Sequence, residues 1–447
     1  MNLMRARKTV KAALILSIAF LIFGSPSAAL EIKRKTLADG LTLLHVKRDN
    51  LPVVMVTLLL KASPLDEPAD RAGLAYLTAT LLTEGTKSRT SSEISEETEF
   101  IGASLDAGTN QDYTIVRLSV LKKDINKGFE LFSDVLLNPK FSNEEIERKR
   151  ELIKGSLRQR EEEPSYVADR AFKRELYGSH PYGRVVEGSG ETLDKINRKE
   201  IVNFHKDYYA PNNAILAVVG DVSGEELDGL IKKFFRGWEK AGVPESGHGF
   251  EAMKGSRLVR IDKDLTQANI LFGGIGIKRD NPDFYAVSVM NYILGGGGFS
   301  SRLMRRIRDE MGLAYDVHSF FTSNKEPGYF QVGVQTKNAS ANTVIEEITA
   351  QIKSMKAEGV ASGELEDAKA FLTGSFPGKI DTMRKIADFI STVEFYGLGT
   401  DYMDRYPAYI NSVTPGDIKR VAAKYLDLEN CVLVVVADQK KADVKDR

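Results

Sequence analysis

Apolar and polar positions follow the same order in two successive stretches of the chain. The first stretch opens with two apolar runs of strand length and continues with helical spacing near 70–83. Its further expected elements are strands at 104–121 and 213–222, and helices at 91–103, 124–137 and 143–163. The opening strands cover 41–48 and 53–62. This mixture of segregated helices and strands predicts an α+β unit.

The second stretch repeats the pattern of the first. Its expected elements are strands at 256–263, 268–277, 314–323, 328–336 and 431–437, and helices at 283–295, 300–311, 342–359 and 362–376. A repeated order of elements indicates two related domains and favours an ancestral duplication. Between them, a segment rich in glycine and charge shows no periodicity and predicts a linker at 239–256. We therefore expect α+β domains at 30–238 and 257–447.

The first 29 residues differ from the rest of the chain. Four basic residues precede the apolar run 12–24, and Ser27 and Ala29 form a pair of small residues after it. This pattern predicts a secretory signal that is removed, and hence a periplasmic or other extracytoplasmic protein. The alternative is an uncleaved anchor, although thirteen apolar residues are short for a bilayer span. Cleavage would leave no stable membrane span.

Composition narrows the class of protein. The 447 residues carry 62 basic and 62 acidic side chains, so no basic surplus indicates nucleic-acid binding. Removal of 1–29 takes away four basic and no acidic residues, which leaves 58 against 62 and a net charge of −4. Cys431 is the sole cysteine and lies in an apolar strand-like run. An internal disulfide is therefore excluded, and Cys431 is expected to be a small buried residue.

Six motifs in the same order resemble those of the pitrilysin–insulinase metallopeptidases, also called inverzincins. The resemblance is strongest to the short bacterial and mitochondrial processing-peptidase-like subunits. The motifs are AGLAYLTATLLTEGT, SLDAGTNQDYT, HPYGRVVEGSGETL, FHKDYYAPNNAILAVVGDV, ILGGGGFSSRLMRRIRDEMGLAYDV and GELEDAKAFLTG. The resemblance implies two related α+β domains, each with a mixed or antiparallel sheet backed by helices. In the family these domains close like a clam shell on a peptide.

The family's zinc motif is degenerate in this sequence. Active members carry Gly-x-Ala-His-x-x-Glu-His on a helix, in which two histidines bind zinc and the glutamate is the general base. Gly73 and Ala75 match that motif, but Tyr76, Ala79 and Thr80 stand in the places of its first histidine, glutamate and second histidine. A phenol, a methyl group and a hydroxyl cannot replace two imidazoles and a carboxylate.

The third zinc ligand of the family is a glutamate on a later helix, and its place corresponds to Ser156. A shift of one residue gives Gly155 or Leu157, which are not ligands either, and Lys149 stands at a further acidic position of the family. We expect no metal site in this chain. A site assembled from residues distant in the sequence is the open alternative, although no two of the five histidines lie within a helical turn or hairpin: His45, His180, His205, His248 and His318.

The second domain retains the pair that the family offers to substrate. That pair is a basic residue at the end of a helix and a tyrosine seven residues later, and Arg308 and Tyr315 have this spacing, with Gly312 as a helix stop between them. A guanidinium and a phenol can stabilise the negative charge that develops on oxygen during amide hydrolysis. The alternatives are a solvated cation near a helix C-terminus and a core aromatic residue.

Two further segments are candidates for contact with substrate. Four consecutive glycines, Gly295, Gly296, Gly297 and Gly298, suit a flexible loop or a close backbone approach, with a turn at a helix N-terminus as the simpler interpretation. No Gly-Lys-Ser/Thr follows them, so they do not form a phosphate-binding loop. The segment 104–114 resembles the edge strand to which substrate adds in active members.

The resemblance implies a subunit that acts with a partner. We expect the non-zinc subunit of an exported heteromeric zinc peptidase, inactive alone, with zinc and general base in a sister chain of the same family and a peptide as substrate. The alternative is a catalytically inactive scaffold or peptide-binding protein with the same fold. A self-sufficient peptidase of another mechanism ranks last, because the sequence shows no nucleophile–base constellation.

Overall fold

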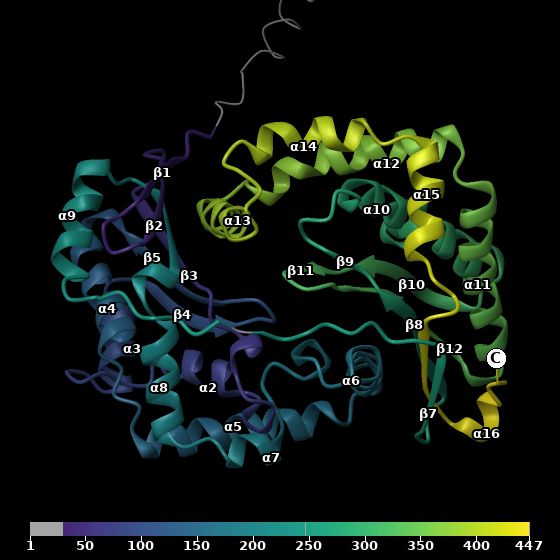
Figure 1. The fold of residues 1–447 in the computed structure, drawn as a ribbon, viewed down its shortest axis with the longest axis horizontal. Coiled ribbons are helices and arrows are strands. Elements are labelled where there is room, and N and C mark those ends of the chain that lie inside the picture. The colour runs from purple at the N-terminus through teal and green to yellow at the C-terminus, as the bar shows by residue number, and fades with distance from the viewer. Residues whose placement is uncertain (1–29, 246, 447) are drawn as a thin grey trace, which may run out of the picture.

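Two sheets with helices around them form the molecule (Figure 1). The structure is a computed structural model that describes residues 30–245 and 247–446. The expected signal segment 1–29 lies outside the described residues. Among the residues described, no helix is both long enough and apolar enough to cross a membrane.

The first sheet has six strands in the order β1-β2-β6-β3-β5-β4. Its strands are β1 (Lys33–Thr36), β2 (Thr42–Lys47), β3 (Val53–Leu60), β4 (Ser104–Thr109), β5 (Thr114–Leu121) and β6 (Ala214–Gly220). Strands β2 and β6 are parallel and the other neighbours are antiparallel. The central strand β6 is buried along its whole length, as its unbroken apolar run requires.

The second sheet repeats this topology with five strands in the order β10-β12-β8-β13-β7. Its strands are β7 (Arg257–Asp262), β8 (Gln267–Ile275), β10 (Ala314–Phe321), β12 (Tyr329–Lys337) and β13 (Cys431–Ala437). Strands β7 and β13 are parallel, like β2 and β6, and the remaining pairs are antiparallel. A small parallel pair joins β9 (Ile277–Lys278) to β11 (Ser323–Asn324). Both halves are therefore α+β units with mixed sheets and one common strand order.

Helices cover the sheets of both halves. The first half contains α2 (Leu74–Thr80), α3 (Ser91–Phe100), α4 (Ile125–Leu137), α5 (Asn143–Arg160), α6 (Pro164–Tyr177), α7 (Gly190–Asp194), α8 (Arg198–Tyr208) and α9 (Gly224–Phe234). The second contains α10 (Phe284–Asn291), α11 (Ala341–Glu358), α12 (Ser362–Ser375), α13 (Met383–Phe395), α14 (Tyr402–Asn411), α15 (Pro415–Tyr425) and α16 (Gln439–Ala442). Two helical segments of the second half, Tyr292–Gly296 and Met304–Glu310, are π-helical. The described residues of the expected linker, 239–245 and 247–256, contain no helix or strand.

One helix of each half packs against the sheet of the other half. Helix α13 of the second half packs its apolar residues, among them Ile386 and Ile390, against Leu44, Val219 and other residues of the first sheet. Helix α6 of the first half packs in the same way against β13 of the second sheet. Figure 1 shows α13, in yellow-green, beside the first sheet and α6 near β7 and β8 of the second. The cores of the two halves are therefore shared.

A buried carboxylate also joins the halves. Asp112, 5 % exposed, accepts hydrogen bonds from the hydroxyls of Tyr182 and Tyr396 and, at 2.9 Å, from the backbone N–H of Lys325. Asp112 and Tyr182 belong to the first half, whereas Lys325 and Tyr396 belong to the second. Burial and the neighbouring Asp112 carboxylate raise the pKa of both phenols, so they remain donors.

Candidate functional site

A buried carboxylate, that of Glu67, binds the N-terminus of α2, the helix that carries the degenerate motif. Gly73 adopts a left-handed conformation (φ +98°) before α2, and a Cβ atom there would meet the carbonyl oxygen of Glu187 at 2.5 Å. The Glu67 carboxylate, 3 % exposed, accepts from the backbone N–H groups of Gly73 and Ala75, each at 3.0 Å. Burial nevertheless raises the pKa of Glu67 to about 8. The glycine and alanine that match the motif therefore shape the start of the helix.

The three altered motif positions have different environments. Tyr76 is half-buried and Ala79 is fully buried, while the Thr80 hydroxyl donates to backbone carbonyls of its own helix, at 3.1 Å to Tyr76 and 3.2 Å to Leu77. Burial raises the pKa of the Tyr76 phenol, and the nearby Glu187 raises it further. Glu187 in turn forms an ion pair of 2.8 Å with Arg160 of α5.

Arg308 lies in the π-helical segment Met304–Glu310, and Gly312, two residues after its end, has a φ of +63°. The chain then enters β10, the edge strand of the second sheet. This path brings the Arg308 guanidinium to 4.9 Å from the ring centroid of Tyr315 and 4.5 Å from that of Phe299. Tyr315 is 85 % exposed and so is not a core aromatic. Arginine held between two aromatic faces is an oriented cation.

The four glycines span the end of one helical segment and the start of the next: Gly295 and Gly296 end the π-helical segment, and Gly298 begins a short 3₁₀ helix, Gly298–Ser300, which agrees with the expected turn at a helix N-terminus. Gly295 is buried, and a Cβ atom there would lie 2.5 Å from the hydroxyl of Ser319 on β10. At Gly296 and Gly297, a Cβ atom would meet Asn291 at 2.6 Å and Tyr292 at 2.7 Å. Only Gly298 has positive φ, +56°. Close packing thus accounts for the first three glycines.

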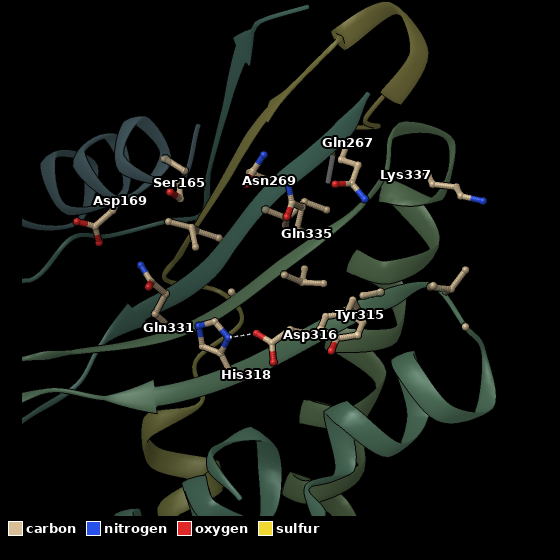
Figure 2. Close-up of a pocket in the computed structure, with 18 residues that line it drawn as sticks. Ser165, Asp169, Gln267, Asn269, Tyr315, Asp316, His318, Gln331, Gln335 and Lys337 are labelled. Carbon is tan, nitrogen blue, oxygen red and sulfur yellow. Dashed lines mark hydrogen bonds and ion pairs between the residues drawn. The ribbon is translucent and has the colours of Figure 1, made fainter. Parts of the chain in front are cut away.

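Tyr315 lines a polar cavity of about 770 Å³ on the face of the second sheet. Helix α6 forms the opposite wall through Ser165 and Asp169, as Figure 2 shows. Four amide side chains from β8 and β12 cover the sheet side: Gln267, Asn269, Gln331 and Gln335. Tyr76, Ala79, Thr80, Ser156 and Arg308 do not line this cavity. The structure thus brings Arg308 to Tyr315, and it leaves the altered motif positions elsewhere.

The cavity holds groups that sequence reasoning missed. The Asp316 carboxylate lies 2.8 Å from Nδ1 of His318, and both side chains are about half exposed. Gln331 is 4 % exposed, and its amide nitrogen is buried without a hydrogen-bond partner among the described residues. Gln331, Gln335 and Lys337 of β12 carried this signal, because alternate residues of a strand share a face.

Two family models match consecutive parts of the chain. The insulinase (peptidase family M16) model matches residues 44–190, and the peptidase M16 inactive domain model matches residues 195–372. An uncharacterized zinc protease of Mycobacterium leprae is 30% identical over 349 residues, which cover 76% of this chain and 77% of that protein. The chain belongs to the insulinase (M16) family. An uncharacterized zinc protease of Bacillus subtilis is 25% identical over 77% of this chain and 83% of that protein.

Solved structures agree with this M16 assignment. A peptidase M16 inactive domain from Pseudomonas fluorescens superposes with a TM-score of 0.86 at 26% identity, covering 91% of this chain and 98% of that one. A protease from Helicobacter pylori has the same fold, with a TM-score of 0.84 at 22% identity over 91% of this chain and 99% of that one. The resemblance seen in the sequence motifs is thereby confirmed.

The zinc that the M16 family implies does not fit the residues at its place. Tyr76 offers a half-buried phenol whose raised pKa keeps it neutral, Ala79 offers no donor atom, and the Thr80 hydroxyl is used within its helix. Ser156 is exposed on α5, and Lys149 on the same helix forms an ion pair with Glu84. Zinc requires imidazole, thiolate or carboxylate ligands. Among the described residues, no three histidine, cysteine, aspartate or glutamate side chains form a group that could hold a metal ion.

Four of the histidines in this M16 chain make hydrogen bonds to the backbone or pack against other aromatic rings. Ring nitrogens of His45, His205 and His248 bond backbone carbonyls of Val222, Leu136 and Leu65, at 3.0, 2.8 and 2.6 Å. His180 and His248, distant in the sequence, stack edge to face with ring centroids 6.2 Å apart. Burial lowers the pKa of His205 to about 4. His180 and His205 therefore have the packing and hydrogen-bonding roles expected of them.

Proposed function

We propose that this chain is the non-zinc subunit of an exported, heteromeric M16 peptidase. A sister chain of the family would hold the zinc and the general base, and the substrate would be a peptide. The observation that supports this proposal most is the pairing of Arg308 with the exposed Tyr315 beside a polar cavity. The exposure of Tyr315 leaves the pair accessible to a substrate at this rim.

The chemistry of the pair follows from its geometry. The face of Tyr315 lies toward Arg308, which leaves the hydroxyl at the ring's edge as a donor toward solvent or substrate. The guanidinium, held by Phe299 and Tyr315, keeps its N–H groups for an oxygen that gains negative charge. Donors oriented in advance stabilise such an oxygen without reorganisation during the reaction.

Kinetics on the reconstituted pair test the proposal. The chain is co-purified from the native envelope fraction with its zinc-bearing sister, and metal content is measured for each subunit. Arg308→Ala and Tyr315→Phe should each lower kcat about 10²-fold, as loss of one oxyanion donor does in other hydrolases. KM should change less, because these contacts form mainly in the transition state.

Arg305→Ala provides the matched control. Arg305 is exposed on the same π-helical segment but makes no contact with Tyr315. This variant should keep full turnover, and gel filtration should show intact assembly for all three. Unchanged turnover in both Arg308→Ala and Tyr315→Phe would support the scaffold alternative instead.

A further inference from the structure

A second cavity, of about 670 Å³, lies on the other side of α6. Helices α5 and α6, the loop 183–190 and strand β7 of the second sheet surround it. Its volume falls within the range of about 300–1,000 Å³ that is typical of small-molecule sites. It shares no lining residue with the cavity of Tyr315.

Helix α6 contributes an acidic residue to the cavity of Tyr315, and two arginines and one glutamate, Glu175, to the second cavity. Ser165, Ala168 and Asp169 line the cavity of Tyr315. Arg170 and Arg174, on the other face of the helix, line the second cavity. Residues three and four apart share a helix face, so this separation follows from the spacing of these residues along the helix. The second cavity therefore has a cationic wall that is separate from the proposed catalytic groups.

The lining of the second cavity has a surplus of positive charge. Its basic residues are Lys154, Arg158, Arg170, Arg174 and Arg184, and its acidic residues are Glu161 and Glu175. Glu161 is paired with Arg170 at 2.6 Å, Glu175 is paired with Arg257 at 2.8 Å, and Lys154 is paired with Asp194 at 2.9 Å. Arg158, Arg174 and Arg184 form no ion pair with any residue that the structure describes. Three guanidinium groups are therefore available to bind an anion from solution.

Arg184 is the most buried of these three. Its Nε and Nη1 atoms are buried and have no acceptor within the described part of the chain. The carboxyl group whose charge acts on Arg184 is that of Glu67, which also holds the start of α2. Because burial raises the pKa of Glu67 to about 8, that carboxyl is mostly uncharged at neutral pH. Arg184 therefore lacks a full countercharge.

Much of the remaining lining is apolar. Leu157 of α5, Val167 and Ala171 of α6, and Val259 and Ile261 of β7 contribute side chains to the wall. A free inorganic anion would leave this surface in contact with water. An anion that carries an aliphatic chain would bury it, at a gain that grows with each methylene group. Charge and apolar surface together indicate an amphipathic anion.

We propose that this cavity binds a single-chain alkyl phosphate, with the phosphate at Arg158, Arg174 and Arg184 and the chain along the apolar wall. A phosphate monoester carries a charge of about −1.5 to −2 at neutral pH, which matches three unpaired guanidiniums better than one carboxylate does. Guanidinium groups also bind phosphate oxygens through two parallel hydrogen bonds. The site is independent of the proposed peptidase function.

Calorimetric titration of the full chain with dodecyl phosphate tests the site. One molecule should bind per chain. Inorganic phosphate, which lacks the chain, and dodecyl maltoside, which lacks the charge, should each bind at least about 100-fold more weakly. Dodecanoate should bind about tenfold more weakly than dodecyl phosphate, because it carries less charge.

Variants locate the binding. Arg158→Gln and Arg174→Gln change exposed residues, and each should weaken dodecyl phosphate about tenfold. Arg236→Gln removes a positive charge that is also exposed but lies outside the cavity, and it should leave binding unchanged. Arg184→Gln should have the largest effect, with thermal denaturation of the free protein as the check that it is folded.

Four outcomes of the titrations above would overturn the proposal. They are no binding of dodecyl phosphate, equal binding by the Arg158→Gln/Arg174→Gln double variant, equally tight binding of inorganic phosphate, and equally tight binding of dodecyl maltoside. Hexaglutamate provides a further test. If it displaces dodecyl phosphate and binds more tightly, the proposal is also overturned, since the cavity would then be a site for acidic peptides.

Discussion

Glu67 illustrates how one residue can shape a helix while losing its charge. Its carboxyl group satisfies two N–H groups at the start of α2, where a helix has no internal acceptors. Helix α2 is only seven residues long, so such a cap matters for whether it forms at all. The same carboxyl is 3 % exposed, and that burial disfavours its ionised form.

We expect Glu67→Gln to change how stability depends on pH. The pKa of Glu67 rises from 4.5 to about 8 on folding, so its contribution is complete below pH 4.5 and is lost as pH rises through about 8. The variant keeps only one acceptor oxygen and should be less stable than the wild type at pH 5. At pH 8.5 this difference should shrink or reverse.

Urea denaturation of both proteins at pH 5 and pH 8.5 measures this difference. The exposed Glu99→Gln variant of α3 serves as the control and should follow the wild type at both values. A stability difference between wild type and Glu67→Gln that stays constant with pH would show that Glu67 does not gain a proton on folding.

Helix α13 is an element whose place is fixed by both apolar and polar contacts. Its apolar face packs on the first sheet, and on the same helix Asp388 accepts from the Thr57 hydroxyl and from Arg117, both at 2.9 Å. Thr57 and Arg117 face each other on β3 and β5. The charged pair specifies where the helix sits, while the apolar residues provide most of the stabilisation.

Ile390→Ala should therefore destabilise the whole protein. Ile390 is 2 % exposed, and removal of such a side chain typically costs about 2–5 kcal/mol. Leu152→Ala, at a position 56% exposed on α5, should cost less than about 0.5 kcal/mol. Chemical denaturation of both variants gives the comparison. Equal costs for the two would mean that α13 is not held to the first sheet in solution.

The elements themselves could largely be predicted from the sequence, because their periodicity is strong. The apolar runs at β6 and β13 and the alternation in β12 correspond to strands, and the repeated order appears as repeated topology. The exchange of α6 and α13 could not be predicted. An amphipathic pattern shows that a helix has an apolar face, and it does not show which sheet that face covers.

The candidate site was predictable only in part. The resemblance to the family singled out Arg308 and Tyr315, whereas their spacing alone would not have distinguished them from a solvated cation and a core aromatic residue. The buried Glu67 gave no signal, and neither did Arg184, which has no ion pair within the described residues, because isolated charged residues in loops resemble solvated ones. Their roles depend on burial by segments remote in the sequence.

At the scale of the whole molecule, the exchanged helices and the bonds to Asp112 make one cooperative unit. Residues 30–238 alone would lack α13 and would expose an apolar surface that includes Leu44, Leu59 and Ile215. We expect this fragment to aggregate or to remain partly unfolded. The full chain should unfold in a single transition.

Separate expression of 30–238 and 257–447 tests this expectation, with analytical ultracentrifugation and circular dichroism as the measurements. The two fragments should recover a native-like complex when produced together, because each supplies the helix that the other lacks. A monomeric 30–238 fragment with its own cooperative unfolding would contradict the expectation.

The exchange of helices also has a consequence for synthesis on the ribosome. The first sheet is complete once β6 has emerged, but α13, which covers one face of it, is more than 150 residues further along the chain. At about 5–20 residues per second, that face waits for roughly 10–35 s. Throughout this interval one apolar face of the first sheet is exposed on the nascent chain. The order of synthesis therefore makes this face available to a chaperone until α13 has been made.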